Sequence, residues 1–178
     1  HIHSEASRLM ALISDIIRLS QLDEGEEMPR GNVDLYAEAE EAEENLRTAA
    51  EEKGVKLSLT GEGAEISGVR RLVYEIIYNL CDNAVKYNRP GGSVEVRVTQ
   101  SESEAAVTVA DTGIGIAPED QARVFERFYR ADKSRSKESG GTGLGLSIVK
   151  HAVQYHHGSI DLKSTPGEGT TIKVTFPK

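Results

Sequence analysis

The 178-residue sequence is 38% hydrophobic and 28% charged, proportions that are ordinary for a folded globular protein and exclude a largely disordered chain. Its formal net charge of −8 argues against general nucleic-acid binding. No apolar run approaches the roughly 20 residues that span a bilayer, so we expect no membrane contact. With Cys81 as the single cysteine, an internal disulfide is excluded.

The first predicted element is an amphipathic helix over residues 2–22. Its apolar residues recur at spacings of three, four and seven, which is typical of the seam between helices of a bundle. They are Ile2, Leu9, Leu12, Ile13, Ile16, Leu19 and Leu22. One helix cannot bury such a seam, so we expect a fragment of a dimeric helical hairpin. The alternative is packing onto the chain's own globular domain.

A linker with Pro and Gly follows at residues 26–32, and periodicity then predicts the remaining elements. Helical spacing predicts helices over 36–53, closed by Gly54, over 69–87 and over 144–156, closed by Gly158, with a short helix over 119–127. Alternation of apolar and polar residues predicts strands over 33–35, 55–60, 64–67, 93–99, 105–110, 159–163 and 170–176. Residues 130–142 have no apolar period, so we expect them to be mobile.

The predicted fold class is α+β. We expect a two-layer α/β sandwich, in which three helices cover one face of a mixed, mostly antiparallel sheet, preceded by the bundle-type helix. The predicted division of the chain is a helix over 1–25, a linker over 26–33 and a globular domain over 34–178.

Polar residues gather on one side of the helix over 69–87. Glu75, Asn79 and Asn83 are spaced four residues apart and share a face, with Lys86 and Tyr87 close to it. Mg²⁺ takes oxygen ligands and keeps waters, with phosphates completing its shell, so this face fits a metal–phosphate ligand. The alternative is a set of ordinary capping or surface side chains.

Two glycine-rich stretches are the second feature. Asp111 ends a β-branched run, where its carboxylate could accept the N6 amino proton of adenine, and Gly113 and Gly115 let the backbone pass under a base. Gly143 and Gly145 precede a helix, whose N-terminus favours phosphate. The basic segment 123–137 between them holds six basic and two acidic residues. Neither a P-loop nor a Rossmann fingerprint occurs.

These stretches resemble four motifs of sensor histidine kinases, in the same order. Asn-Leu-Cys-Asp-Asn-Ala-Val-Lys-Tyr at 79–87 resembles the N box, Asp-Thr-Gly-Ile-Gly at 111–115 the first glycine box, Phe-Glu-Arg-Phe-Tyr-Arg at 125–130 the F box, and Gly-Thr-Gly-Leu-Gly-Leu-Ser at 141–147 the second glycine box. Residues 34–178 therefore resemble the catalytic ATP-binding domain, of the GHKL or Bergerat fold, and residues 2–25 the second helix of the dimerisation hairpin.

The resemblance implies ATP and Mg²⁺ as cofactors. Asn83 would coordinate Mg²⁺ with Asn79 nearby, Asp111 would bind adenine, and residues 117–142 would form a lid anchored by Phe125 and Phe128. The residues that it assigns to the nucleotide are Asn83, Lys86, Tyr87, Asp111, Gly113, Gly115, Ile116, Arg130, Gly141, Thr142, Gly143, Leu144, Gly145 and Thr171.

The resemblance also implies the reaction and its partners. The γ-phosphate would pass to a histidine on the first hairpin helix and then to a cognate response regulator, within a dimer of the full-length kinase. The catalytic candidates are Asn79, Arg130 at the γ-phosphate, and Glu75 as a base. This sequence contains no His-Glu-x-x-x-Pro-like segment, so we expect no autophosphorylation by it alone. We expect a cytoplasmic domain of a membrane-anchored protein.

Two other functions share the same motifs. One is a GHKL-type enzyme of another class, an ATP hydrolase or a serine kinase. However, Asn79 occupies the turn at which the related gyrase and chaperone ATPases carry a water-activating Glu. The other is a nucleotide-gated interaction module without catalysis, whose lid orders when ATP binds.

Overall fold

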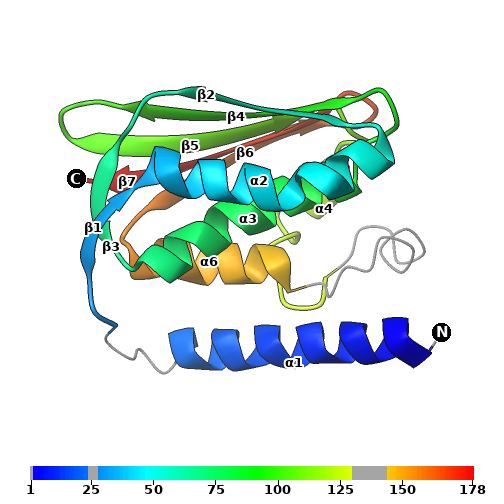
Figure 1. Ribbon diagram of the computed structural model, residues 1–178, viewed down its shortest axis with the longest axis horizontal. Helices are drawn as coiled ribbons and strands as arrows, with labels where there is room; N and C mark the ends of the chain where they lie inside the picture. Colours follow the sequence, from blue (N-terminus) through cyan, green and yellow to red (C-terminus); the bar gives the residue numbers. More distant parts are fainter. Residues whose placement is uncertain (1, 24–27, 130–143) are drawn as a thin grey trace.

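The computed structural model describes residues 2–23, 28–129 and 144–178 (Figure 1). The elements in chain order are α1 (Ile2–Asp23), β1 (Gly31–Asp34), α2 (Leu35–Lys53), β2 (Lys56–Gly61), β3 (Glu65–Gly68), α3 (Arg70–Lys86), β4 (Ser93–Gln100), β5 (Glu104–Asp111), α4 (Pro118–Gln121), α6 (Gly145–Tyr155), β6 (Ser159–Thr165) and β7 (Gly169–Pro177). No helix within these ranges is long and apolar enough to cross a membrane.

The main sheet has five strands in the order β2-β4-β5-β7-β6. Strands β2 and β4 are parallel, and the other three pairs are antiparallel. A second, two-stranded antiparallel sheet joins β1 to β3. Helices α2, α3 and α6 lie together on one face of the main sheet (Figure 1). The predicted α+β class, with a mixed, mostly antiparallel sheet under three helices, is confirmed.

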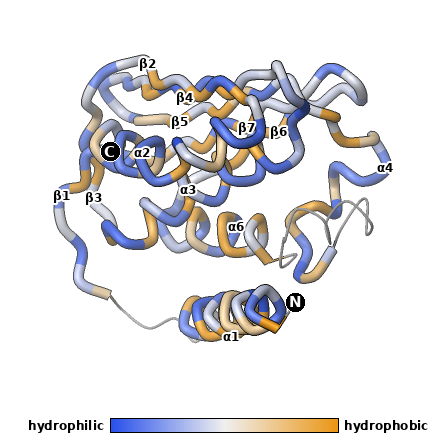
Figure 2. Tube along the Cα trace, turned by 45° about the vertical axis from the view of Figure 1, so that its right-hand side comes forward, coloured by the Kyte–Doolittle hydropathy of each residue, from blue (hydrophilic) through white to orange (hydrophobic). Residues whose placement is uncertain are grey.

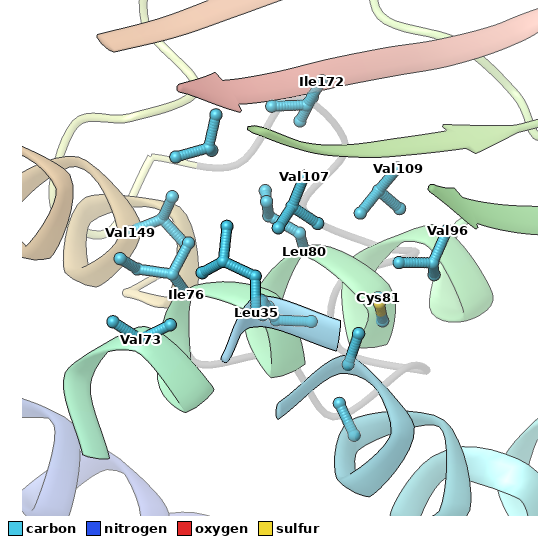
Figure 3. Close-up of a cluster of buried hydrophobic side chains, with 14 of the residues drawn as sticks. Leu35, Val73, Ile76, Leu80, Cys81, Val96, Val107, Val109, Val149 and Ile172 are labelled. Carbon is cyan, nitrogen blue, oxygen red and sulfur yellow. The ribbon is translucent and has the colours of Figure 1, made fainter. Parts of the chain in front are cut away.

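The hydrophobic core lies between this sheet and the helices, where side chains from α3, α6, β5 and β7 point toward one another (Figure 3). Ile76, Val107, Val149 and Val174 are all less than 1% exposed. Fully burying a side chain of this size contributes about 1.5–3 kcal/mol. Cys81 belongs to the same core, and burial raises the pKa of its thiol to about 12. It is therefore an inert core residue.

Helix α2 ends at the predicted glycine, but it begins one residue earlier than predicted, directly after Asp34. Asp34 is the N-cap: its carboxylate accepts hydrogen bonds from the backbone N–H of Tyr36, at 3.1 Å, and of Ala64, at 3.0 Å. The helix ends at Gly54, whose φ of 73° is left-handed and favours glycine. One carboxylate thus begins α2 and ties it to the segment that enters β3.

Two predicted helix ends differ from the structure. The short helix spans only Pro118–Gln121, because bonds between residues three apart, such as Tyr129 N–H to Glu126 O at 3.2 Å, continue the chain as successive turns. Phe128 has a φ of 61° and is 56% exposed, so its predicted packing role is wrong. After α6 the left-handed residue is His157, with a φ of 57°, rather than Gly158. Gly158 is required for a different reason, because a Cβ there would lie 2.6 Å from the carbonyl oxygen of Thr175.

The apolar seam predicted on α1 divides into two stripes. Leu19 and Leu22 are buried, with Leu19 packing against Leu144 and Ile148. Other seam residues remain exposed, Ile2 at 85% and Leu9 at 56%, and Figure 2 shows that hydrophobic positions recur along α1. The alternative of packing on the chain's own domain therefore holds for one stripe. Membership of a dimeric hairpin stays a prediction for the other.

His156 joins the end of α6 to the start of α3. It is 3% exposed; its Nε2 accepts a hydrogen bond from the Val69 N–H at 3.0 Å, and its Nδ1 lies 2.7 Å from the carbonyl oxygen of Ala152. Because Nε2 accepts, Nδ1 is the nitrogen that carries the proton, so the ring is neutral. Burial lowers the pKa of His156, against the opposing hydrogen bond to Ala152.

We expect the free energy of unfolding to fall in acid through His156. Its pKa in the folded state is lower than its ordinary value of 6.5, so its contribution is complete above pH 6.5 and is lost as the pH falls toward the lowered value. Urea unfolding at pH 8 and pH 5 measures this loss. In His156→Phe the loss between the two pH values should shrink, and at pH 8 the unsatisfied Val69 N–H should cost about 1–3 kcal/mol. The exposed neighbour gives the control, His157→Asn, which should keep the pH dependence. An unchanged dependence in His156→Phe would contradict the assignment.

Candidate functional site

Asp111 stands at the end of β5, on the face of the sheet that the helices cover. Its Oδ1 accepts two backbone hydrogen bonds, from the N–H of Gly113 at 2.8 Å and from the N–H of Thr170 at 3.2 Å. Burial raises the pKa of Asp111 above its ordinary value, while these two N–H groups act in the opposite direction. Two donors on one oxygen hold the carboxylate in a single orientation.

The loop 111–115 is pressed between the end of α3 and the turn that joins β6 to β7. A Cβ at Gly113 would lie 2.4 Å from the carbonyl oxygen of Tyr87. A Cβ at Gly115, whose φ is 72°, would lie 2.2 Å from the carbonyl oxygen of Thr165. Both glycines are therefore required by neighbouring backbone, independently of any ligand.

Hydrogen bonds secure the same loop on both sides. The N–H of Ile114 donates to Tyr87 O at 3.1 Å, and the carbonyl of Ile114 accepts from the N–H of Gly167 at 2.8 Å. The N–H of Ile116 donates to the hydroxyl of Ser164 at 2.7 Å. Predicted site residues from α3 and from the loop are thus brought together with the β6–β7 turn.

The second half of α3 presents the predicted polar residues, and Asn79, Asn83, Lys86 and Tyr87 are all half-buried. The amide Nδ2 of Asn79 donates to the carbonyl of Glu75 at 2.9 Å. The ammonium of Lys86 pairs with Asp82 at 2.9 Å. These contacts hold two of the four side chains along the helix.

The start of α6 lies against this polar face. A Cβ at Gly145 would be 3.3 Å from Oδ1 of Asn79, so glycine lets the two helices approach closely here. Leu144, the residue before α6, is less than 1% exposed and packs against Leu19 of α1. Its side chain therefore packs between α6 and α1. Arg130, Gly141, Thr142, Gly143 and the predicted lid residues from 130 onward lie outside the described residues.

Glu75 is at the contact between α3 and α1. Its Oε1 lies 2.6 Å from Nη1 of Arg18. Burial raises the pKa of Glu75, while Arg18 and Arg71 lower it. The carboxylate is thus engaged by α1 in this structure, and its role as a base stays a prediction.

The structure places Thr170, not Thr171, beside Asp111. Thr170 pairs with Asp111 in register, and side chains alternate along β7, with Ile172 and Val174 buried on the helix side. The hydroxyl of Thr170 also lies 2.8 Å from that of Ser164. Thr171, by the same alternation, points to the opposite face of the sheet, and the contact of a threonine with adenine stays a prediction. Sequence analysis missed both Thr170 and Ser164, although the alternation of residues 170–176 could have identified the former.

The arrangement combines groups of distinct chemistry: a half-buried carboxylate that can accept a hydrogen bond from a ligand, half-buried carboxamides on α3, and the N-terminus of the 11-residue helix α6. In the described part of the chain, no group of three or more His, Cys, Asp or Glu side chains could hold a metal ion. A cation there would depend on oxygens supplied by an anionic ligand.

Comparison with known proteins gives the class to which this fold and site belong. The chain belongs to the family described as histidine kinase-, DNA gyrase B- and HSP90-like ATPases, whose model matches residues 68–178. That match includes α3, the loop 111–115, α6 and the β6–β7 turn. The family is therefore established for the part of the chain that forms the site.

Within this family, the relatives that resemble the chain include sensor histidine kinases. The chain is 39% identical over 177 residues to the sensor-like histidine kinase SenX3 of Mycolicibacterium smegmatis, covering 98% of this chain and 46% of that protein. It thus spans less than half of that curated relative. The structure resembles the mycobacterial sensor histidine kinase MprB, with a TM-score of 0.73 and 29% identity over 84% of this chain and 97% of that one. It also resembles full-length ShkA solved with AMPPNP, with a TM-score of 0.84 and 27% identity over 97% of this chain and 36% of that one.

Proposed function

We propose that this chain is the catalytic ATP-binding part of a sensor histidine kinase, which transfers the γ-phosphate of Mg-ATP to a histidine. The named relatives support this reaction, and the observation that carries it here is the orientation of Asp111. Both of its backbone bonds end on Oδ1, and in the described part of the chain Oδ2 accepts no hydrogen bond. Oδ2 can therefore accept the 6-amino proton of adenine. Guanine carries an oxygen at that position, which a carboxylate repels.

The phosphates belong at the other end of the site. The backbone at the start of α6 has N–H groups without helical partners, and its dipole favours anions. Asn83 presents an amide oxygen of the hardness that Mg²⁺ prefers, but one neutral amide cannot hold the ion without phosphates. Magnesium, when bound with ATP, would neutralise charge on the transferred group. Asn79 lies against Gly145 and would orient the phosphates, a role that suits transfer rather than water activation.

The remaining assignments follow from the same proposal. Residues 1–25 would form the second hairpin helix, residues 26–33 a linker and residues 34–178 the catalytic domain. A second copy of the full-length kinase would complete the hairpin dimer, and a response regulator would receive the phosphoryl group from the histidine. The catalytic part would act in the cytoplasm, where ATP and the regulator are found, with the full-length protein anchored in the membrane.

Phosphoryl transfer in trans tests the proposal. The 178-residue chain is mixed with Mg-ATP labelled at the γ-phosphate and with a separate helical hairpin. Its first helix, taken from a sensor histidine kinase relative, carries the phosphoacceptor histidine. We expect acid-labile label on the hairpin, and a rate about 100-fold lower with Asn83→Ala, because one preorganised charge-stabilising group is lost.

A matched amide on α2 provides the control. Asn45 is exposed and donates to the hydroxyl of Tyr74 at 2.8 Å, so Asn45→Ala should transfer at the wild-type rate. Steady phosphate release without label on the hairpin would indicate an ATP hydrolase instead. Binding of ATP without either product would indicate a nucleotide-gated interaction module.

A further inference from the structure

Arg89, which follows α3, links two loops that lie far apart in the sequence. Its Nη2 donates to the carbonyl oxygen of Gly113 at 2.9 Å and to that of Gly167 at 2.6 Å. Gly113 belongs to the loop after β5, whereas Gly167 belongs to the β6–β7 turn. One guanidinium nitrogen therefore holds the backbone of both loops at once.

The segment that carries Arg89 is itself held by Asn88, which joins it to the start of β4. The N–H of Arg89 donates to Oδ1 of Asn88 at 2.9 Å, and Nδ2 of Asn88 donates to Ser93 O at 2.9 Å. Asn88 is only 5% exposed, and a Cβ at Gly92 would lie 2.1 Å from its Oδ1. The guanidinium thus extends from a backbone position that the surrounding bonds hold in place.

The loop after β5 and the start of β7 each supply a hydrogen bond to Asp111. Gly113 donates its N–H to Oδ1 of Asp111 while its carbonyl accepts from Arg89. Thr170, three residues after Gly167, donates the second N–H to the same oxygen. The two N–H groups that orient the carboxylate therefore belong to Gly113 itself and to the residue three positions after Gly167, the two glycines whose carbonyls Arg89 holds.

We propose that Arg89 is a positioning residue for base recognition. By holding Gly113 and Gly167 together it sets the direction in which Asp111 presents Oδ2, and so the preference for a 6-amino purine. This inference rests on the proposed function for its ligand but not for its geometry. The guanidinium matters as a planar donor of two N–H groups, which an ammonium on a different stem does not reproduce. Arg89 is exposed, so replacing it opens no cavity in the core.

Two measurements on the 178-residue chain test the inference, using Arg89→Met, which keeps an unbranched stem but removes the donors. Without nucleotide, the amide ¹H–¹⁵N signals of Gly113 and Thr170 should shift in Arg89→Met. With nucleotide, calorimetry should show ADP affinity reduced about fivefold to tenfold. The affinity for inosine diphosphate, measured by competition, should stay unchanged because it lacks the 6-amino group. Arg89→Lys should recover less than half of the lost ADP affinity, on a logarithmic scale.

Arg97 provides the matched control, since it is an exposed arginine on β4 paired with Glu95 at 2.6 Å. Arg97→Met should change neither the two amide signals nor either affinity. Equal losses for ADP and inosine diphosphate would make Arg89 a phosphate contact and overturn the positioning role. Unshifted amide signals together with wild-type ADP affinity would overturn it as well. If the wild-type chain bound no ADP, the proposed function would fail, and the amide shifts alone would decide whether Arg89 orients Asp111.

Discussion

Asp111→Asn is expected to weaken ATP binding by about 100-fold while leaving the fold intact. Asparagine keeps an oxygen for the N–H groups of Gly113 and Thr170, which donate at 2.8 and 3.2 Å in the wild type. Its amide nitrogen then replaces Oδ2, so that one donor faces the amino group of adenine. Two N–H donors that face each other without an acceptor cost about 3 kcal/mol of binding free energy, which corresponds to roughly 100-fold in affinity.

The stability of this variant gives the second half of the expected result. Burial raises the pKa of Asp111, which means that the folded state disfavours the ionised carboxylate relative to the unfolded state. Replacing it by a neutral amide removes that cost at pH 7. The melting temperature should therefore stay equal or rise, in keeping with the strain that functional groups impose on a fold.

Calorimetric titration with Mg-ATP and a thermal unfolding scan measure the two quantities. The matched control is Asp161→Asn, the same chemical change on an exposed position of β6, which should alter neither. Wild-type affinity in Asp111→Asn would remove the basis for base recognition at this residue. A large drop in melting temperature would show instead that the carboxylate is needed for folding.

Gly169→Ala is expected to destabilise the protein by about 2–5 kcal/mol. Gly169 has a φ of 136°, and its Cβ would lie 2.0 Å from the carbonyl oxygen of Asp111. Left-handed backbone costs a non-glycine residue about 1–2 kcal/mol, and forced overpacking adds about 1–3 kcal/mol. The contact is with backbone at the end of strand β5, so no flexible side chain can move aside.

The β6–β7 turn contains its own control two residues earlier. Gly167 also has a left-handed φ, of 83°, but a Cβ there would meet no atom within 4 Å. Gly167→Ala should therefore cost only about 1 kcal/mol, from backbone strain alone. Thermal unfolding should show a fall of roughly 10 °C for Gly169→Ala and about 3 °C for Gly167→Ala. Equal effects would mean that the close approach to Asp111 relaxes without cost.

Local pattern was sufficient for most of the fold. Val94, Val96 and Val98 alternate with polar residues, and the sequence places Leu72, Ile76 and Leu80 at helical spacing, so each element follows from the face that it must bury. The periodic pattern is weak after Gln121, and there the predicted end of the short helix was wrong. In residues 122–129 the apolar residues do not recur at a helical spacing that would bury one face in the core. The chain there forms turns instead of continuing α4.

The seam of α1 and the threonine beside Asp111 differ in whether the sequence alone could have placed them. The spacing of Ile2, Leu9 and Leu19 is compatible with one stripe, but only the position of α6 decides that Leu19 is covered while Ile2 is not. For the threonine, the period-2 alternation of β7 was sufficient, since Thr170 has the same parity as Ile172.

The sequence by itself determined the class of fold, the four motifs and the residue types of the site, because periodicity and composition are local properties of the chain. The tertiary structure alone decided which partners those residues meet. Glu75 pairs with Arg18, the Val69 N–H binds His156, and Arg89 joins Gly113 to Gly167. Each of these contacts crosses a long stretch of sequence, and the burial of the surrounding side chains, rather than any local pattern, brings the two groups together.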